Sequence, residues 1–465
     1  MLISKSALTL APSLLLFASL SLAPGCSGSQ LQGNMDPGTF MPVTVPGCTG
    51  TCGIRTDCPT DQGPTTLTGV VNIPAGNLPL YNARVYIPSG DMPAAPVSGA
   101  SCDRCDSVPP AAAFTTTGID GTFTLTDVPV GENIPLIISV GKWRRVVTLP
   151  PITACTKTAL DVSQTRLPRN QSEGNIPKIA LTTGGADAME CLLRSSKLGL
   201  DDSEFTLPTG SGRVNFYSGS GNPGPATTRY QAGFNGSTAA VSLPTANPWW
   251  DQLSNLQKND ILILSCEGAQ FDNTKSASAK TALQGYLDKG GRVFASHWHN
   301  DWLQNGTTAL KSVATFTAYN GPDPSTETID TSPGFTKGQA LADWMMLPSV
   351  MGSTVRGQLT VNGARYTLNT IAPKITQRWV YYQPQTGPAL PQYFSFNAPV
   401  GADSTLQCGQ MVFTDLHVTS GGTGNVDSGG PDFPGGCQAG ALSAQEKALI
   451  FMLFDLTNCL APPIG

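Results

Sequence analysis

Charged residues are scarce in this chain of 465 residues. Asp, Glu, Lys and Arg make up 13% of it, against a usual share of about 25% in soluble domains. The 27 basic and 32 acidic residues give a net charge of −5 and form no basic block, which argues against nucleic-acid binding through a phosphate-neutralising face. No stretch after the N-terminal segment approaches the roughly 18 apolar residues of a membrane span, so we expect none in the mature chain.

Glycine and proline, by contrast, are abundant, with 50 and 38 residues. The apolar share of 40% is high enough for real cores, so the composition excludes general disorder. At roughly 150 residues per domain, the length predicts about three folding units. The composition is typical of a loop-rich β and α/β protein.

Residues 1–25 have the pattern of an export signal. Lys5 precedes the apolar stretch Ala7–Leu22, which Pro12 and several serines make too weak for a membrane span. The segment ends in Leu22-Ala23-Pro24-Gly25-Cys26 and resembles a bacterial lipobox, although Ala23 and Pro24 depart from the pattern. The resemblance implies lipidation of Cys26 and a lipoprotein of the bacterial outer membrane or cell surface. The alternative is a plain secretory signal and a periplasmic or secreted protein.

The cysteines agree with export. Two clusters, Cys48-x3-Cys52-x5-Cys58 and Cys102-x2-Cys105, have spacings that could also suit zinc knuckles. In an oxidising compartment, disulfides are the favoured interpretation.

Two further predictions concern particular thiols. If Cys26 carries lipid, 11 of the 12 cysteines remain and at least one stays unpaired. Cys266, at the end of a buried apolar strand, is the best candidate. Cys408 begins a late strand and Cys459 follows the final helix, which should return antiparallel across the sheet. We therefore expect Cys408 and Cys459 to lie within disulfide reach.

The Cys, Gly and Pro content of residues 26–63 indicates a spacer. The short alternating segments within residues 64–168 predict an all-β sandwich. Four segments resemble the carboxypeptidase regulatory-like domain, a transthyretin-like sandwich. They are Gly69-Val70-Val71, the Pro79–Val85 run, Asp120-Gly121-Thr122-Phe123-Thr124-Leu125 and Val128-Pro129-Val130-Gly131. The resemblance implies a non-catalytic module that supports a neighbour. A long Cys-bearing insertion, at about 89–113, departs from it.

Residues 176–351 and 406–465 predict an α/β domain, interrupted by a β insertion at 352–405. The apolar strand Asp260–Cys266, a helix at about 275–289 and the strand Arg292–His297 form a right-handed βαβ unit. Ser443 and Glu446 predict a capping box at the start of the final helix.

This half resembles the class I glutamine-amidotransferase-like superfamily, especially its trehalose-utilisation-like branch, which implies a flavodoxin-like fold. The resemblance rests on the Asp260 strand, Gly290-Gly291, the strand ending at His297, and the late strand and helix. The Gly-x-Cys-x-Gly elbow of the amidase is missing, because Ala295-Ser296-His297-Trp298-His299 stands in its place.

The three histidines of the chain, His297, His299 and His417, all follow predicted strands of the α/β domain. In parallel sheets, ligand sites gather at these strand ends. His297 and His299 share a face if the strand stays extended. Together with His417 they are candidate ligands for zinc or another divalent metal.

Several neighbours complete this candidate site. Glu267 and Asp415 are the candidate general bases for a metal-bound water. Cys266, Trp298, Asp301 and Trp302 are the candidate pocket residues. The alternative is structural: the histidines bond loop backbones, and the two tryptophans fill the core.

These observations lead to one principal hypothesis and one rival. The principal hypothesis is an exported cell-envelope protein, membrane-bound through its N-terminal lipid, with a non-catalytic ligand-binding or scaffolding role. Its expected partners are a carbohydrate or another envelope component. The rival is a metal-dependent hydrolase that uses His297, His299 and His417.

Overall fold

The computed structural model describes residues 57–105, 109–194, 196–220, 227–418, 432–437 and 440–460. These residues all belong to one compact unit, Pro42–Gly465. The expected signal peptide, Cys26 and most of the spacer lie outside the described residues. Within them, no helix has the length and apolar character needed to cross a bilayer.

The early part of the chain forms two small sheets that share one core. A five-stranded sheet has the order β3-β2-β5-β6-β8, and a three-stranded sheet has the order β4-β1-β7. Phe123 and Leu125 alternate with exposed threonines along β4 and pack into the same apolar cluster as Ile138. Apart from the short helix α1, this part, which we call the sandwich, is therefore all-β, as its alternating pattern predicted. Its elements are β1 (Thr66–Val70), β2 (Arg84–Pro88), β3 (Ala111–Thr116), β4 (Thr122–Thr126), β5 (Pro135–Val140), β6 (Trp143–Thr148), β7 (Lys157–Ala159), α1 (Val162–Thr165) and β8 (Gly174–Asn175).

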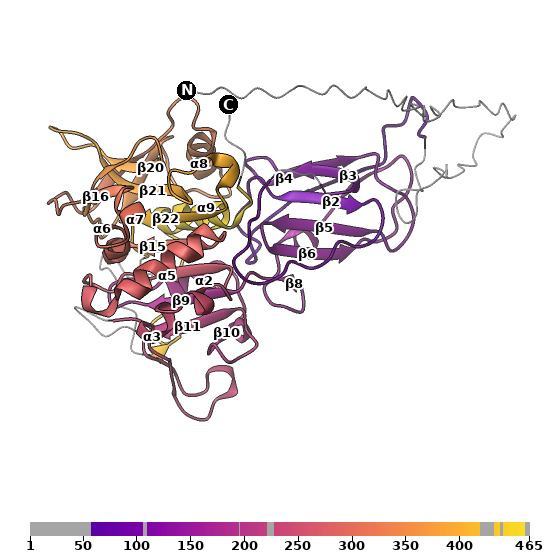
Figure 1. Ribbon diagram of the computed structural model, residues 1–465. Helices are drawn as coiled ribbons and strands as arrows, with labels where there is room; N and C mark the ends of the chain where they lie inside the picture. The colour runs from indigo at the N-terminus through magenta and orange to yellow at the C-terminus, as the bar shows by residue number, and fades with distance from the viewer. Residues whose placement is uncertain are drawn as a thin grey trace, which may run out of the picture. The chain divides into compact units, whose positions relative to one another are not determined.

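A ten-stranded sheet dominates the rest of the chain, in the order β10-β11-β9-β14-β15-β22-β21-β20-β17-β18 (Figure 1). The strands from β10 to β22 are parallel, and those from β22 to β18 are antiparallel. The strands are β9 (Ile179–Thr183), β10 (Phe205–Thr206), β11 (Val214–Ser218), β14 (Ile261–Leu264), β15 (Arg292–Ser296), β17 (Ser325–Ile329), β18 (Gln358–Val361), β20 (Thr376–Tyr382), β21 (Leu390–Ala398) and β22 (Gly409–Thr414).

Helices cover both faces of the parallel half. Leu262 of β14 packs in one apolar cluster with Leu283 of helix α5, whereas its neighbour Ile263 packs in the other cluster with Leu449 of helix α9. Successive residues of a strand point to opposite faces, so α5 and α9 lie on opposite sides of the sheet. The helices of this part are α2 (Met189–Leu193), α3 (Asn247–Trp250), α4 (Leu253–Leu256), α5 (Ala277–Asp288), α6 (Asp301–Gln304), α7 (Thr308–Lys311), α8 (Thr336–Met346) and α9 (Ala444–Thr457).

Two sequence signals in this half agree with the structure. Strands β14 and β15 pair in parallel with α5 between them, as the βαβ pattern predicted. The predicted capping box is also present, because Ser443 accepts from the Glu446 amide and the Glu446 carboxylate accepts from the Ser443 amide. The β strands after residue 352 do not form a separate layer. Strands β18, β20 and β21 instead extend the main sheet.

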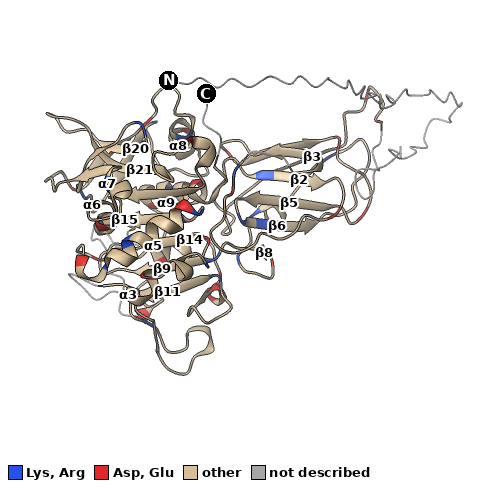
Figure 2. Cartoon of the chain, viewed as in Figure 1, with Lys and Arg blue, Asp and Glu red and all other residues tan. Residues whose placement is uncertain are grey.

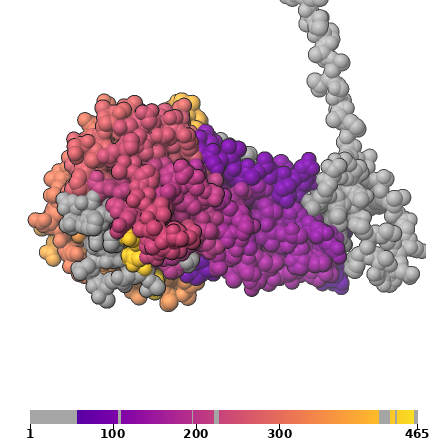
Figure 3. Space-filling view, turned by 90° about the horizontal axis from the view of Figure 1, so that it is seen from below, coloured from indigo at the N-terminus to yellow at the C-terminus, as the bar shows by residue number. Residues whose placement is uncertain are grey.

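Two smaller sheets complete the fold, in the orders β13-β12-β23 and β16-β19. The late strand β23 pairs with β12, so yellow atoms lie among magenta and pink ones in the space-filling view (Figure 3). These strands are β12 (Arg229–Tyr230), β13 (Val241–Ser242), β16 (Ala314–Phe316), β19 (Leu368–Ile371) and β23 (Asp432–Phe433).

Two disulfides join the sandwich to the main sheet. Cys102 pairs with Cys408, and Cys105 pairs with Cys459, with Cα–Cα distances of 4.7 and 5.1 Å. The predicted Cys408–Cys459 bond is therefore wrong. The start of β22 and the end of α9 do lie in the same region. Cys408 and Cys459 form their disulfides with Cys102 and Cys105 of the sandwich instead of with each other. Backbone hydrogen bonds from Cys105 to Leu460 and from Leu460 to Asp103 hold that segment there.

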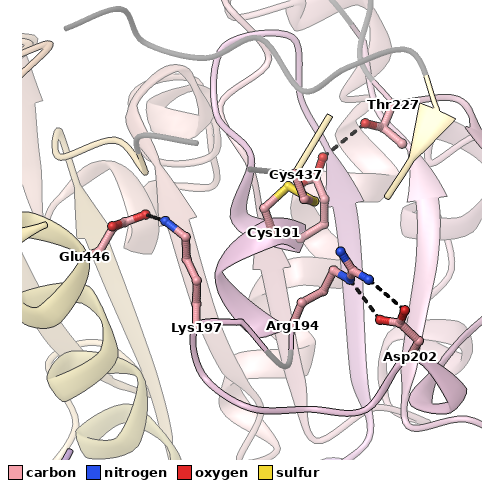
Figure 4. Close-up of a disulfide and its surroundings, with 8 residues drawn as sticks. Cys191, Arg194, Lys197, Asp202, Thr227, Cys437 and Glu446 are labelled. Carbon is pink, nitrogen blue, oxygen red and sulfur yellow. Dashed lines mark hydrogen bonds and ion pairs between the residues drawn. A yellow bond between two sulfur atoms is a disulfide. The ribbon is translucent and has the colours of Figure 1, made fainter. Parts of the chain in front are cut away.

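The other two disulfides are Cys58–Cys155, within the sandwich, and Cys191–Cys437. Cys191–Cys437 ties α2 to the residues just after β23 (Figure 4). The Arg194–Asp202 ion pair lies close to it in the same view. With Cys102 and Cys105 both in disulfides, the zinc-knuckle interpretation of their spacing is excluded.

Polar contacts reinforce the junction between the sandwich and the sheet. The Asp260 carboxylate accepts from Lys142 Nζ at 2.6 Å and from the Gly99 amide at 2.8 Å. Trp344 of α8 donates its indole N–H to Pro79 O at 2.9 Å. Elsewhere the charged residues are few and scattered, in keeping with the composition (Figure 2).

Candidate functional site

The parallel strands β9, β14, β15 and β22 place their carboxyl ends at one edge of the sheet. Cys266 follows β14, His297 follows β15 directly, and His417 follows β22. The sheet topology therefore brings together three residues that are far apart in the sequence. This is the edge at which ligand sites gather in parallel sheets.

Cys266, His297 and His417 form a tight cluster. Their ligand atoms all lie within 4.8 Å of one another. Cys266 Sγ is 3.3 Å from His297 Nδ1, and the two imidazole centroids are 4.9 Å apart. All three side chains are buried, with exposed fractions of 0%, 3% and 1%.

The backbone of His297 is unusual. Its φ of 40° lies in the left-handed region, which residues other than glycine rarely adopt. The chain turns sharply there, because β15 ends at Ser296 and the 3-10 helix η5 (His297–Asn300) begins at once. Strained conformations of this kind cluster at functional sites.

His299 does not join the cluster. The expectation that His297 and His299 share a face required an extended strand, and η5 replaces that strand with a helical turn. His299 Nε2 donates to Ser265 O at 2.9 Å, and Nδ1 accepts from Trp302 Nε1 at 3.0 Å. Both ring nitrogens are therefore used, so the structural alternative applies to His299.

The candidate tryptophans differ in a similar way. Trp302 is 1% exposed and packs edge-on against Trp250 at 5.2 Å, so it fills the core. The Trp298 ring lies 4.6 Å from that of His297 and is partly exposed. Trp298 thus borders the cluster, whereas Trp302 donates its indole N–H to His299, outside the cluster.

The candidate acids are all engaged by other groups. Glu267 binds Lys275 Nζ at 2.6 Å and accepts from the Ser220 amide. Burial raises the pKa of Glu267, although Lys275 opposes this shift. Asp301 accepts from Asn305 at 2.6 Å and lies 3.3 Å from Lys280 Nζ.

Both carboxylate oxygens of Asp415 accept hydrogen bonds from neighbouring residues. Its carboxylate accepts from the amide and hydroxyl of Thr367, both at 2.8 Å, and from the Leu368 amide at 3.1 Å. Burial raises the pKa of Asp415 to about 6, and these hydrogen bonds oppose the shift. Asp415 therefore holds the loop before β19 in place.

Asp187 also belongs to the site, although it is not among the residues predicted from the sequence. Its carboxylate accepts from Ser296 Oγ at 2.5 Å and from the Val418 amide at 2.8 Å. It thus bonds the residue before His297 and the residue after His417. Burial raises the pKa of Asp187 to about 7. Its position just beyond β9, at the same edge of the sheet, is the signal that could have found it.

The protonation states at the cluster follow from its burial. Burial raises the pKa of the Cys266 thiol and lowers the pKa of His417 to about 3. The pKa of His297 is likewise lowered, by burial and by His417. Both imidazoles are therefore neutral at pH 7, and the thiol is protonated. This state offers lone pairs to a metal but does not favour a thiolate–imidazolium nucleophile.

Comparisons with known proteins do not identify a family. No protein-family model matches this chain, and no curated protein matches it. Among solved structures, a ThuA-like protein from Bacteroides uniformis is 11% identical, with a TM-score of 0.27, over 46% of this chain and 76% of its own. A type II cohesin–X-dockerin complex from Acetivibrio cellulolyticus is 14% identical, with a TM-score of 0.16, over 29% and 82%. These TM-scores are too low to indicate a shared fold.

Proposed function

We propose that this chain is an exported cell-envelope protein that binds a ligand or acts as a scaffold, and that it is not a hydrolase. The observation that carries this proposal is the engagement of every candidate base. Glu267 is paired with Lys275, and Asp415 is saturated by Thr367 and Leu368. His299, the third expected metal ligand, has no free ring nitrogen. A hydrolase of the predicted kind would need one of these two carboxylates free to act as the general base for its water.

Export is supported by the disulfides. Four are present among the described residues, and structural disulfides are typical of oxidising compartments. The proposal includes lipidation at Cys26. In cells fed a labelled fatty acid, Cys26→Ser should abolish labelling and release the chain from membranes. Unchanged labelling of that variant would refute the lipid anchor.

We also propose finer fold assignments for the two parts. The two small early sheets support a transthyretin-like, carboxypeptidase regulatory-like sandwich. The parallel strands with α5 and α9 on opposite faces support a flavodoxin-like domain of the trehalose-utilisation type. Neither module would need chemistry of its own for a binding role.

The proposed ligand is a neutral carbohydrate. A cavity of about 380 Å³ opens beside β20 and β21, within the usual size range of small-molecule sites. Amide side chains of Gln377, Asn397 and Gln407 line it, and Lys337 and Asp455 there pair at 2.7 Å. Amides suit sugar hydroxyls. With Lys337 paired to Asp455, the lining has one further charged side chain, that of Lys374.

Glycan binding tests this assignment. The purified chain should bind members of a panel of neutral glycans, and Asn397→Ala should weaken that binding at least about tenfold. Gln358→Ala is the matched control, because Gln358 is an exposed strand amide in β18, outside this cavity. Equal losses in both variants, or no binding by the original chain, would overturn the carbohydrate assignment.

Activity assays test the rival hydrolase. The zinc-supplied chain should show no turnover of ester, amide, glycoside or phosphoester substrates above that of Asp415→Asn. Turnover that this variant loses while staying folded would favour the hydrolase instead.

A further inference from the structure

His417 poses a problem that the proposed function leaves unsolved. Both of its ring nitrogens are buried and have no hydrogen-bond partner among the described residues. A buried polar atom without a partner destabilises the fold, and such atoms often mark the place of a water or an ion. The imidazole lies 4.9 Å from that of His297, between centroids, so the atoms lacking partners belong to the cluster.

We infer that Cys266, His297 and His417 bind a transition-metal ion, and that this ion is zinc. One thiolate and two imidazoles form a donor set that suits zinc. The three residues come from the ends of three adjacent parallel strands, β14, β15 and β22. This site replaces the predicted set of three histidines with one in which Cys266 takes the place of His299.

The spacing of the donor atoms suits zinc. With zinc–sulfur and zinc–nitrogen bonds of about 2.3 and 2.0 Å, tetrahedral ligands lie roughly 3.3–3.6 Å apart. Cys266 Sγ and His297 Nδ1 are already 3.3 Å apart. The whole set lies within 4.8 Å, so a shift of about 1 Å in the His417 side chain would complete the geometry. When zinc binds, the Cys266 S–H proton leaves to solvent, and its sulfur lone pair forms the bond to the metal.

The surroundings supply positioning and charge. Asp187 bonds Ser296 and Val418, the neighbours of the two histidine ligands. Outer hydrogen bonds orient metal ligands and tune the affinity, and those of Asp187 act through the residues beside the two histidines, not through their rings. The positive charge of Arg365 acts on both histidines. The same charge also acts on the buried carboxylate of Asp415.

The inference goes beyond the proposed function and holds whatever the cavity beside β20 and β21 binds. The test uses the full chain, stripped by chelator and then given zinc or cobalt(II). We expect about one tightly held zinc per chain, a higher melting temperature with zinc, and a thiolate-to-cobalt charge-transfer absorption. Cys266→Ser and His417→Gln should remove that absorption and bind zinc at least about 100-fold more weakly.

His299→Gln is the matched control, because His299 is a buried histidine of the same segment with both nitrogens engaged elsewhere. It should keep the cobalt absorption even if its melting temperature falls. Asp187→Asn should keep the absorption and weaken zinc binding about 10–100-fold.

Three results would overturn the inference. They are no tight zinc in the folded original chain, a cobalt spectrum without the thiolate absorption, and an unchanged spectrum in His417→Gln. The first two measurements use the unsubstituted chain, so they do not depend on whether a variant folds.

Discussion

The sandwich and the main sheet bury different kinds of side chain. Among the described residues up to 168, the buried side chains with a formal charge are two arginines, Arg144 and Arg166. The later part buries many acids and bases as well as the three histidines. They are Asp187, Glu190, Lys197, Glu204, Asp260, Glu267, Lys275, Arg292, Asp301, Glu327, Asp330, Asp415 and Glu446.

This difference indicates where specific chemistry is concentrated. Burial of a charge is costly unless a partner compensates it, so a chain with few charges has reason to keep them on its surface. Here the sandwich core is almost wholly apolar. The carboxyl edge of the main sheet instead holds paired charges and strained backbone at His297. It also holds His417, whose ring nitrogens have no hydrogen-bond partner in the part of the chain that the structure describes.

The largest expected effect comes from separating the two regions. Cys102→Ser with Cys105→Ser removes both disulfides between them, which span 306 and 354 residues. Each loss should cost about 2–5 kcal/mol, and urea denaturation should change from one transition to two. The variant pair Cys58→Ser with Cys155→Ser, within the sandwich, should lower stability without splitting the transition. A single transition in both would show that the regions do not depend on these bonds for joint unfolding.

Next in size is the loss of a buried ion pair in the main sheet region. Lys275 and Glu267 are both fully buried, so Lys275→Met should lower the free energy of unfolding by about 3–5 kcal/mol. The double variant with Glu267→Leu should recover most of this loss, because no unpaired charge remains. Arg229→Met, at the exposed Arg229–Asp432 pair, should cost under about 1 kcal/mol. Equal losses of unfolding free energy in Lys275→Met and Arg229→Met would contradict the view that burial makes the first pair more important.

Much of the fold follows from local sequence patterns. The alternation along β4, the βαβ unit around α5 and the capping box of α9 are each specified by a few neighbouring residues. The Cys102–Cys408 and Cys105–Cys459 bonds depend on how a loop of the sandwich lies against the sheet. No local pattern contains that information, which is why the pairing predicted from strand and helix lengths is wrong.

The sequence predicts at which edge of the sheet the site lies, but not which residues make up the cluster. Strand order alone places Cys266, His297 and His417 together. His299 lies outside the cluster because the chain leaves the extended conformation at His297. No residue type at this position predicts that turn. Asp187 was missed because its role is a pair of hydrogen bonds to residues distant in sequence.

The pH dependence of stability should also differ between the regions. Burial raises the pKa of Glu327 from 4.5 to about 8. Between these values the unfolded chain has lost a proton that the folded chain keeps, so Glu327 lowers stability as the pH rises from about 4.5 to about 8. Glu327→Gln should therefore flatten this decline in urea denaturation. Glu132→Gln, at an exposed position of the sandwich, should leave it unchanged. An unaltered slope in Glu327→Gln would contradict the shift.

The smallest expected effect concerns the two capping boxes, one in each region. Ser443 caps the long buried helix α9, so Ser443→Ala should cost about 1 kcal/mol at every pH, because a hydroxyl does not titrate. Asp161 caps the short helix α1, and its hydrogen bonds with Ser163 lower its pKa. A depressed pKa stabilises the fold above the unfolded value, and this contribution is lost as the pH falls through the folded value.

Asp161→Ala should therefore reduce stability at neutral pH and have a smaller effect in acid below the folded pKa, where the uncharged carboxyl group caps more weakly. Urea denaturation of both variants across that range distinguishes the two caps. A loss in Asp161→Ala that persists unchanged in acid would show that the carboxylate charge does not contribute to this cap. A loss in Ser443→Ala that varies with pH would contradict a cap made by the hydroxyl alone.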